Sequence, residues 1–258
     1  MLSKNYYAIV VVYNCSYKDS TIYKSLKNQH DAEVIVCDNS IKDYGNCDFT
    51  AEIGCKYVNM QGNKGLPKAY NAAIDIIQDK NGVVCLFDDD TTVPEDYFKK
   101  LDMHFINSDY DIILPVVFDE NGLLSPSIMR GDIIQKAKSL DELCDGKITG
   151  INSGMAIDLK VFVSYRYDDN LFLDFVDHAF IRDMTTAGKK IAIAKDIILN
   201  QKLSVNVYDK LSEIIRFKIA KNDIKYFYNE KLCSYLFVIL KRRIKLCLKY
   251  KTLSFLFI

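Results

Sequence analysis

The sequence contains no pair of cysteines in the C-x-x-C spacing that redox and metal-binding motifs use, although it has eight cysteines. Several of them lie inside apolar runs, where a thiol behaves as a small hydrophobic side chain. The amino-terminal residues also lack the pattern of a secretory signal peptide. We therefore expect free thiols in a reducing, cytoplasmic compartment rather than a disulfide framework.

Long apolar runs are missing as well. The stretch from Tyr7 to Tyr13 is far shorter than the roughly 20 residues that a membrane-spanning helix needs, so it is expected to be a buried strand. The later run from Leu232 to Leu240 has only nine residues. No internal repeat or low-complexity linker interrupts the chain. Its 258 residues, 49% of them hydrophobic, suit one large α/β domain with a small appendage.

The chain carries no net charge at pH 7, but its charges are unevenly placed. Residues 202–258 hold thirteen Lys and Arg against four Asp and Glu, so this tail carries +9 and the remainder carries −9. A basic tail on an acidic body predicts an anionic partner for the tail. Nucleic acid is not the expected partner, because the body is acidic and no known reader motif is present.

Strand-like and helical stretches alternate in the first half of the sequence. The expected strands are 7–13, 34–38, 56–59 and 83–87, and the expected helices lie near 19–29 and 67–79. This order predicts a Rossmann-like, mostly parallel central sheet flanked by helices. Ligands bind at the carboxyl ends of the strands in such sheets, and Asn14, Asp38 and Asp88 all fall at strand ends.

Three consecutive aspartates, residues 88–90, follow the apolar run 83–87. Carboxylates at the end of a buried strand suit a hard divalent cation, Mg²⁺ or Mn²⁺, which keeps positions free for water and phosphate oxygens. A nucleoside diphosphate is therefore the ligand that this cluster suggests. The alternative is a solvated acidic turn before a helix, because Thr92 and Glu95 have the spacing of a capping box.

Four motifs in chain order carry a resemblance to a known family. They are Tyr13-Asn14, Asp38-Asn39-Ser40, Asn63-Lys64-Gly65 and the aspartates 88–90. Together they resemble the family 2 glycosyltransferases with the GT-A fold, especially the rhamnosyltransferase-like branch, over roughly residues 6 to 205. The resemblance implies a catalytic domain at 1–205, with a nucleotide-sugar-binding half at 1–115 and an acceptor-binding and catalytic half at 116–205. A basic, helical C-terminal extension at 206–258 would follow.

The resemblance places a nucleotide-sugar at the strand ends. In the family, the carboxylate that matches Asp38 accepts from the ring N3–H of uracil or thymine, which implies a UDP- or dTDP-sugar. Gly65 permits close backbone approach or a positive φ. The alternative for Asp38-Asn39-Ser40 is a simple turn, because all three residues favour turns, and the alternative for Lys64 is an ordinary exposed loop lysine. The residues expected to contact the donor are Tyr13, Asn14, Asp38, Asn63, Lys64, Gly65, Asp88 and Asp89.

The outer aspartates of the cluster, Asp88 and Asp90, match the D-x-D motif of the family. The resemblance implies that Asp90 binds Mn²⁺ or Mg²⁺ and that Asp88 lies near the metal and the ribose. Family members often have a metal-binding His after the following strand, where this chain presents Gln201. A Gln ligates through its oxygen, more weakly than imidazole does for Mn²⁺. Asp88, Asp90 and Gln201 are therefore the expected metal ligands.

Residues 168–182 resemble the rhamnosyltransferase form of the catalytic-base motif, and this resemblance makes Asp177 the base. An inverting transfer needs a carboxylate that takes the proton of the acceptor hydroxyl. Asp174 is the competing candidate, because residues three apart share one face of a helix. Both could instead be acidic residues that a helix dipole favours. The family often has an acid two positions after the base, where this chain has Ala179.

The resemblance implies a metal-dependent inverting glycosyltransferase that transfers a sugar, rhamnose first, from a dTDP- or UDP-sugar to a surface glycan or lipid-linked saccharide. Ala179 and Gln201 leave open a catalytically inactive nucleotide-sugar-binding or scaffold protein of a glycan assembly complex. In the tail, residues 241–251 mix basic and apolar side chains. They predict an interfacial helix in peripheral contact with the inner face of the cell membrane. The alternative is a helix that packs on the acidic body.

Overall fold

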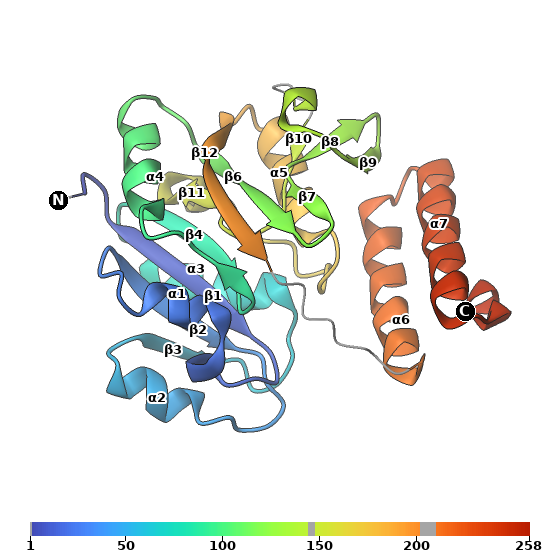
Figure 1. The fold of residues 1–258 in the computed structure, drawn as a ribbon, viewed down its shortest axis with the longest axis horizontal. Coiled ribbons are helices and arrows are strands. Elements are labelled where there is room, and N and C mark those ends of the chain that lie inside the picture. Colours follow the sequence, from blue (N-terminus) through green and yellow to red (C-terminus); the bar gives the residue numbers. More distant parts are fainter. Residues whose placement is uncertain (1, 144–147, 202–209) are drawn as a thin grey trace.

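The computed structural model of the 258-residue chain describes residues 2–143, 148–201 and 210–258. Within these residues a sheet of nine strands, in the order β3-β2-β1-β4-β11-β6-β12-β5 with β7 beside β6, runs through the molecule (Figure 1). Its strands are β1 (Tyr6–Val12), β2 (Ala32–Asp38), β3 (Lys56–Asn59), β4 (Val83–Asp88), β5 (Thr91–Thr92), β6 (Ile112–Asp119), β7 (Gly122–Ser125), β11 (Ala156–Asp158) and β12 (Ile191–Gln201).

The first four long strands form the parallel half of this sheet. Strand β1 pairs in parallel with β2 and β4, and β2 pairs in parallel with β3, so their carboxyl ends share one edge. Side chains alternate across β1, with Tyr7 and Ile9 in one hydrophobic core and Ala8 and Val10 in another. Burial on both faces explains the unbroken apolar runs of these strands. The predicted central sheet flanked by helices is confirmed, and β1–β4 form the expected parallel arrangement. The remainder is mixed, because β11 is antiparallel to both of its neighbours and β5 and β7 pair in antiparallel fashion with β12 and β6.

Helices cover both faces of the sheet. Helices α3 and α5 pack on one face, and α1 and α4 pack on the other (Figure 1). The predicted apolar face of α3 is confirmed, because Ala69, Ala73, Ile74 and Ile77 are all buried. The helices of the body are α1 (Thr21–Leu26), α2 (Asn46–Glu52), α3 (Leu66–Ile77), α4 (Tyr97–Ile106) and α5 (Val176–Thr186), with 3₁₀ turns at Tyr17–Asp19, Leu140–Glu142 and Leu159–Val163.

Two local expectations differ from the structure. The helix expected near 19–29 is shorter, because Ser20 caps α1 by accepting a hydrogen bond from the Tyr23 N–H and the polar run 27–31 has no apolar face to bury. Thr92 and Glu95 do not form a capping box. Thr92 belongs to β5, and α4 begins only after Asp96.

A second, small sheet lies beside the carboxyl-terminal half of the body. Its strands are β8 (Ser127–Arg130), β9 (Ile133–Lys136) and β10 (Ile148–Thr149), in the order β10-β8-β9. Strand β10 lies against α5, which carries the candidate base. This sheet therefore forms a wall close to the expected acceptor side of the molecule.

The C-terminal extension, described here over 210–258, consists of α6 (Lys210–Phe227), α7 (Leu232–Tyr250) and a 3₁₀ turn, η4 (Leu253–Phe257). Phe217, Leu246 and Phe255 join the three elements in a small core of their own. Helix α6 stands between the body and α7 (Figure 1). No helix among the described residues has the length and apolarity to cross a bilayer. The boundary expected at 205 falls outside the described residues, and the one at 115 falls inside β6.

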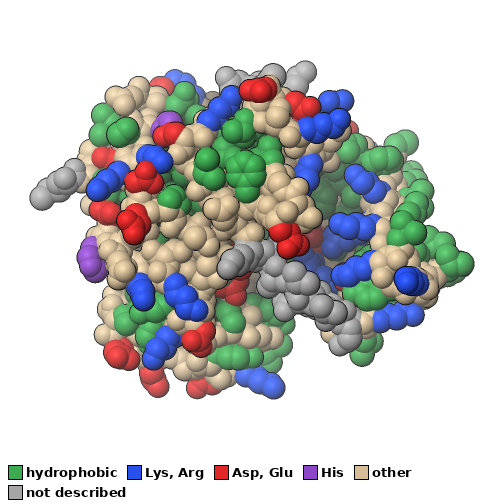
Figure 2. All heavy atoms as spheres, in the orientation of Figure 1, with side chains coloured by type: hydrophobic (Ala, Val, Ile, Leu, Met, Phe, Trp, Pro, Cys, Tyr) green, Lys and Arg blue, Asp and Glu red, His purple; other side chains and the backbone are tan. Residues whose placement is uncertain are grey.

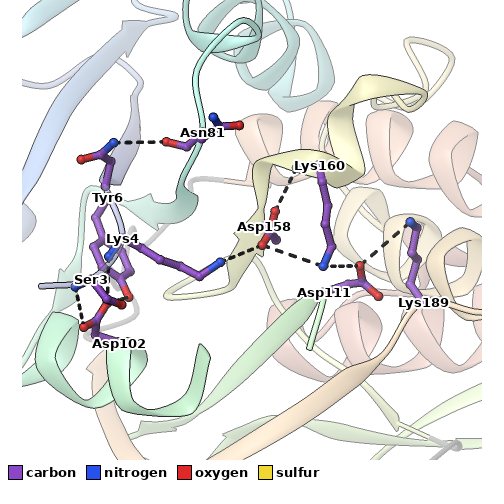
Figure 3. A network of polar contacts seen from close by, with 10 residues as sticks. Ser3, Lys4, Tyr6, Asn81, Asp102, Asp111, Asp158, Lys160 and Lys189 are labelled. Atoms are coloured by element: carbon purple, nitrogen blue, oxygen red, sulfur yellow. Dashed lines mark hydrogen bonds and ion pairs between the residues drawn. The ribbon is translucent and has the colours of Figure 1, made fainter. Parts of the chain in front are cut away.

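The edge of the sheet opposite the carboxyl ends of β1 and β4 is held by a polar network (Figure 3). The Asp102 carboxylate on α4 accepts hydrogen bonds from Ser3, from the Lys4 N–H and from the Tyr6 hydroxyl. Lys4 also pairs with Asp158 at 3.0 Å. These contacts fix the residues that precede β1, so this edge has a structural role and the other edge is left for ligands.

Candidate functional site

A cavity of about 720 Å³ opens where the carboxyl ends of β1 and β4 meet α6. It gathers residues that are far apart in the sequence. The predicted residues that line it are Tyr13, Asn14, Asn63, Gly65, Asp88, Asp89, Asp90 and Gln201. Helix α6 closes the opposite side with Ser212, Ile215, Arg216 and Ile219. The cavity is thus built jointly by the sheet edge and the C-terminal extension.

Two predicted donor contacts lie outside the walls of this cavity. Asp38 lines a smaller, separate cavity of about 350 Å³, together with Tyr57 and Gly62. The Lys64 side chain is exposed and lines neither cavity. The structure therefore brings most of the predicted donor residues together and leaves Lys64 in the solvent.

Asp38 ends β2 and is held by three protein donors. Its Oδ1 accepts from the Ser40 N–H at 2.9 Å. Its Oδ2 accepts from Asn46 Nδ2 at 2.8 Å and from the Tyr57 hydroxyl at 3.1 Å. Burial raises the pKa of Tyr57, and the nearby Asp38 charge raises it further, so the phenol stays a donor. An ionised carboxylate has about four acceptor positions, which leaves Asp38 one for a ligand.

The 63–65 loop follows β3 and turns into α3. Asn63 Oδ1 accepts a hydrogen bond from the Gly65 N–H at 3.1 Å. The Asn39 side chain makes two more bonds to the loop: its Oδ1 accepts from the Lys64 N–H and its Nδ2 donates to the Gly65 carbonyl, each at 3.2 Å. Gly65 has φ of 88°, and a Cβ there would lie 2.7 Å from the Phe172 carbonyl oxygen. Only glycine combines this backbone conformation with so close an approach.

The residues after β1 form the mouth of the cavity. Asn14 has a positive φ of 52°, and its Oδ1 accepts from the Ile41 N–H at 3.0 Å. Its own N–H donates to Ser40 Oγ at 2.9 Å, so the ends of β1 and β2 are tied together. Tyr13 is 48% exposed beside this tie. An exposed aromatic ring at a cavity mouth provides a flat apolar surface on which a planar group can stack.

The acid cluster lies at the floor of the cavity and converges on one amide group. Gln201 Nε2 donates to Asp90 Oδ1 at 2.9 Å and to Asp88 Oδ2 at 3.3 Å. Ser153 also donates to Asp88 Oδ2. The third member, Asp89, accepts from Cys15 Sγ at 2.9 Å. Two carboxylates are thus aimed at one donor position.

Burial raises the pKa of Asp88 to about 6, against the lowering effect of the Ser153 hydrogen bond. The negative charges of Asp90, Asp89 and Asp177 add to the increase. A pocket in which carboxylates repel one another attracts positive charge.

No group of three or more His, Cys, Asp or Glu side chains positioned to hold a metal ion occurs in the part of the chain that the structure describes. The donor set still fits a hard cation. Asp88 and Asp90 direct oxygens at one point, and the Gln201 amide that now occupies it also carries an oxygen. Mg²⁺ is usually held by one or two carboxylates and completes its shell with water and phosphate oxygens. A diphosphate would therefore supply the ligands that the protein lacks.

Asp177 lies in the first turn of α5, whose N-cap Phe175 has a positive φ of 64°. Asp177 Oδ1 accepts from the His178 N–H at 2.7 Å. The Asp177 side chain is 18% exposed. The His178 ring lies between Asp177 and β10, with Nε2 3.8 Å from Asp177 Oδ1 and Nδ1 2.7 Å from Thr149 Oγ1. Ala179, which stands where the family often has an acid, is buried in the hydrophobic core.

Asp174 does not share a helical face with Asp177, contrary to the expectation from spacing. The positive φ of Phe175 separates the two, and the helix begins only at Val176. Asp174 is instead paired with Arg216 of α6 and Arg242 of α7. Burial raises the pKa of Asp174, but the two guanidinium groups outweigh it, so the net pKa lies below its ordinary value. Such a carboxylate is a weak proton acceptor.

The loop before α5, residues 172–174, is anchored by the C-terminal extension. The Asp223 carboxylate of α6 accepts from the backbone N–H groups of Phe172, Leu173 and Asp174 at 3.0, 2.9 and 2.8 Å. The Phe172 carbonyl in turn accepts from the Leu66 N–H at 2.8 Å. A continuous chain of contacts therefore runs from α6 through this loop to the first turn of α3.

The sequence analysis missed the residues that the C-terminal extension contributes, namely Arg216, Asp223 and Arg242. No motif marks them, because each is an isolated charged residue on a long helix. The only available indication was the charge imbalance of the tail. Ser153, in the loop that leads into β11, was not among the predicted site residues either, although its hydroxyl donates to Asp88.

Sequence comparisons find two matches to this chain. Residues 7–160 match the family model described as Glycosyl transferase family 2. The chain is also 27% identical over 204 residues to the dTDP-rhamnosyl transferase RfbF of Shigella flexneri, which covers 76% of this chain and 68% of that protein.

Structural comparisons find several solved structures of similar fold. S. aureus TarS superposes with a TM-score of 0.56 at 16% identity, over 87% of this chain and 43% of that one. A complex of TarS 1–349 with UDP gives 0.55 at 14%, over 86% and 65%. GalNAc-T7 with UDP, GalNAc and Mn²⁺ gives 0.61 at 14%, over 88% and 51%. The chain thus spans less than half the length of TarS, and these likenesses concern the fold alone.

Proposed function

The chain belongs to glycosyl transferase family 2 and has a GT-A fold, and from this premise we propose that it is an inverting enzyme using a dTDP- or UDP-sugar. Rhamnose is the first candidate sugar, since the Shigella flexneri relative is named a dTDP-rhamnosyl transferase. The observation that carries the proposal is the convergence of Asp88, Asp90 and Gln201 in a cavity that the 63–65 loop borders.

The donor would lie across the carboxyl ends of β1, β2 and β4. Asp38 would accept the N3–H of uracil or thymine, since its carboxylate keeps one acceptor position beyond its three protein donors. The exposed ring of Tyr13 would stack on the base or ribose. The diphosphate would then reach the acid cluster, where the cavity wall presents carboxylates to a cation.

The metal proposed for this site is Mn²⁺ or Mg²⁺, held by Asp88 and Asp90 with the Gln201 oxygen as the further ligand. When bound it would neutralise the diphosphate leaving group as the glycosidic bond breaks. Gln201 would have to rotate its amide so that oxygen replaces nitrogen at the point where the carboxylates converge. In the free protein the amide nitrogen donates a hydrogen bond to each of the two carboxylates.

Asp177 would act as the base. Its carboxylate would take the proton of an acceptor hydroxyl while that oxygen forms a bond to the anomeric carbon and the bond from this carbon to the diphosphate breaks. Phe172 and Leu173 line the donor cavity four to five residues before Asp177, so the base would stand close to the diphosphate site. Asp174 is unsuited to this role, because two arginines hold its charge.

The acceptor proposed is a saccharide of a surface glycan, carried on a lipid at the inner face of the cell membrane. A second cavity of about 770 Å³ lies between β8, β10 and α5 and includes His178, the neighbour of Asp177. Its walls carry Arg130, Arg182, Thr149 and Thr185, which provide donors for sugar hydroxyls. Because His178 Nε2 lies 3.8 Å from Asp177 Oδ1, an acceptor bound in this cavity would be close to the base.

The test is the thermal stability of the purified protein with UDP, dTDP, GDP, ADP or CMP, each with and without Mn²⁺. A ligand that binds only the folded state raises the melting temperature by mass action. We expect UDP or dTDP to raise it, more strongly with Mn²⁺, and an Asp90→Asn variant to lose the metal-dependent part. Equal responses to all five nucleotides, or none at saturating concentrations, would contradict the proposed donor.

A second candidate function is supported by Gln201 and Ala179, which replace a metal-binding His and an acid of the family. It is a catalytically inactive nucleotide-sugar-binding or scaffold protein. The two functions differ in turnover, because both predict nucleotide binding but only the first predicts release of the nucleoside diphosphate from a donor with a suitable acceptor. Donor hydrolysis in the absence of an acceptor gives an early discrimination, since an inactive protein would show none.

A further inference from the structure

Helix α7 exposes an apolar stripe along its whole length. Its members recur every four residues, at Leu232, Leu236, Leu240, Ile244 and Leu248. Residues four apart lie above one another on a helix, so these side chains form one continuous face. Leu248 is 75% exposed, and none of the five is less than 47% exposed. This face is not part of the hydrophobic core.

The turn η4 continues the apolar surface. Leu253 and Phe257 are 69% and 86% exposed, and Phe237 on α7 lies beside the stripe at 55%. In Figure 2 hydrophobic side chains lie along the outer edge of the extension. A contiguous apolar surface of this kind on a soluble protein marks a site of association. We call it the α7–η4 surface.

The opposite side of α7 is already occupied. Ile239 and Leu246 are buried against the rest of the protein. Arg242 reaches Asp174 of the body, and Lys249 pairs with Glu213 of α6. Packing on the acidic body, the alternative that the sequence left open, therefore uses one face of the helix and leaves the apolar stripe uncovered.

Lysines border the stripe. Lys241 and Lys245 directly follow Leu240 and Ile244, and Lys251 lies just beyond the helix. Among the described residues no acid comes within the 4.0 Å of an ion pair to any of these three lysines. Residues 210–258 hold twelve Lys and Arg against three Asp and Glu, a net charge of +9. Blue side chains lie beside the apolar edge in Figure 2.

From this arrangement we propose that the α7–η4 surface docks the protein on an anionic lipid bilayer, with α7 lying in the plane of the interface. Helices that combine an apolar face with bordering Lys and Arg bind in this way. The lysines would attract acidic headgroups while the leucines enter the acyl boundary. A second copy of the chain fits less well, because it would bring the same positive charge against this one.

The docked orientation agrees with the architecture. Helix α6 lies between α7 and the donor cavity, into which it carries Arg216. A bilayer bound to the outer face of α7 therefore contacts neither the donor cavity nor the 172–174 loop. Docking and donor binding are therefore independent proposals, and either can fail without the other.

The test is co-sedimentation of the full-length protein with vesicles of phosphatidylcholine alone or mixed equally with phosphatidylglycerol. We expect binding to the mixed vesicles at low salt and weaker binding as salt rises. A Lys241→Gln/Lys245→Gln variant should bind the mixed vesicles about fivefold more weakly for each lysine removed. A Leu240→Gln/Leu248→Gln variant should lose at least about tenfold at every salt concentration.

The matched control is Met103→Gln/Ile106→Gln, which removes two apolar side chains of similar exposure from α4, away from the extension. It should bind vesicles as the wild type does, and all variants should keep the wild-type melting temperature. An equal loss in the control, or no binding of the wild type to anionic vesicles, would overturn the proposal. So would a wild-type dimer that the Leu240→Gln/Leu248→Gln variant dissociates, because a second copy would then occupy the surface.

Discussion

Asp174 and Asp177 are both aspartates, three residues apart, but their neighbours give the two carboxylates different abilities to accept a proton. Asp174 is fixed between Arg216 and Arg242. Asp177 is bonded through one oxygen to the backbone of its own first helical turn, which leaves its other oxygen for a substrate. Position in space, rather than residue type, therefore decides which carboxylate can take a proton.

Replacing Asp177 with Asn should lower kcat about 10²- to 10⁴-fold and leave the affinity for the nucleotide unchanged, because only the proton acceptor is lost. Replacing Asp174 with Asn should instead lower the stability of the protein and leave the proton acceptor in place. Two arginines would lose their partner, at a cost of about 1.5–3 kcal/mol in the free energy of unfolding. Steady-state kinetics and chemical denaturation of both variants measure this difference. Full turnover by Asp177→Asn would remove it as the base.

Gly65 predicts a second effect at the scale of one residue. A Gly65→Ala variant must place its Cβ 2.7 Å from the Phe172 oxygen, in addition to adopting a positive φ. Gly54→Ala is the control, because Gly54 has φ of 73° and nothing within 4 Å of its Cβ position. Both variants should lose about 1–3 kcal/mol of stability from the backbone. Only Gly65→Ala should also weaken nucleotide binding, which isothermal titration calorimetry can measure.

The sequence predicts these residues unevenly. Asn14, Asp38 and Asp88 were predictable, because parallel strands bring their carboxyl ends to one edge whatever lies between them. Gln201 was placed beside the acid cluster by resemblance, and its amide does lie there. Asp174 was misplaced, because helical spacing was assumed across Phe175, and a positive φ at a non-glycine residue cannot be foreseen from its neighbours.

At the scale of elements, α6 supports the catalytic half of the molecule. Asp223 holds three successive backbone N–H groups of the 172–174 loop, and the ring of Phe227 packs on Phe175 at 4.8 Å between centroids. The loop then packs on Gly65. Helix α6 consequently sets the position of the residues between the donor cavity and the base.

An Asp223→Asn variant tests this support. The amide keeps one acceptor but turns a donor toward N–H groups, so the 172–174 loop should lose part of its anchoring. We expect kcat to fall several-fold, with a smaller change in nucleotide affinity, and limited proteolysis within the loop to become faster. Glu213→Gln is the control, because Glu213 bonds only Lys249 and Tyr250 among the contacts described within the extension. It should lower the melting temperature without changing kcat.

Strands β1–β4 were predictable from their apolar runs and α3 from its apolar face, because their burial extends over many residues. Helix α2 was missed, since its seven residues bury only Asn46 and Thr50 and show no apolar stripe. The contacts of α6 were unpredictable for another reason. Asp223 and the loop it holds are about 50 residues apart, and such pairings depend on how complete elements pack.

At the scale of the whole molecule, the two edges of the sheet have different tasks. The carboxyl-end edge gathers acids that repel one another around a cavity. The opposite edge satisfies its acids with local donors (Figure 3). Burial raises the pKa of Asp102, but its hydrogen bonds from Ser3, Tyr6 and Lys4 outweigh this, so the net pKa is lowered.

This predicts how stability changes with pH. An aspartate whose pKa is lower in the folded state stabilises the protein above its unfolded value of about 3.9 and loses that contribution as the pH falls through the folded value. An Asp102→Asn variant should therefore be less stable than the wild type at pH 7, and the difference should shrink below about pH 4. Thermal melts from neutral to acidic pH measure it. A difference that stays constant with pH would exclude this role.

The antiparallel strand β11 also determines when the sheet can be completed during protein synthesis. It fills the gap between β4 and β6, and its Ala156 pairs with Cys85 of β4, about 70 residues earlier. At roughly 5–20 residues per second, a ribosome would leave the edge of β4 without its partner for about 4–14 s. The nascent chain must keep this apolar edge from pairing elsewhere during that interval. Chaperone binding during synthesis should accordingly be strongest between the emergence of β4 and that of β11.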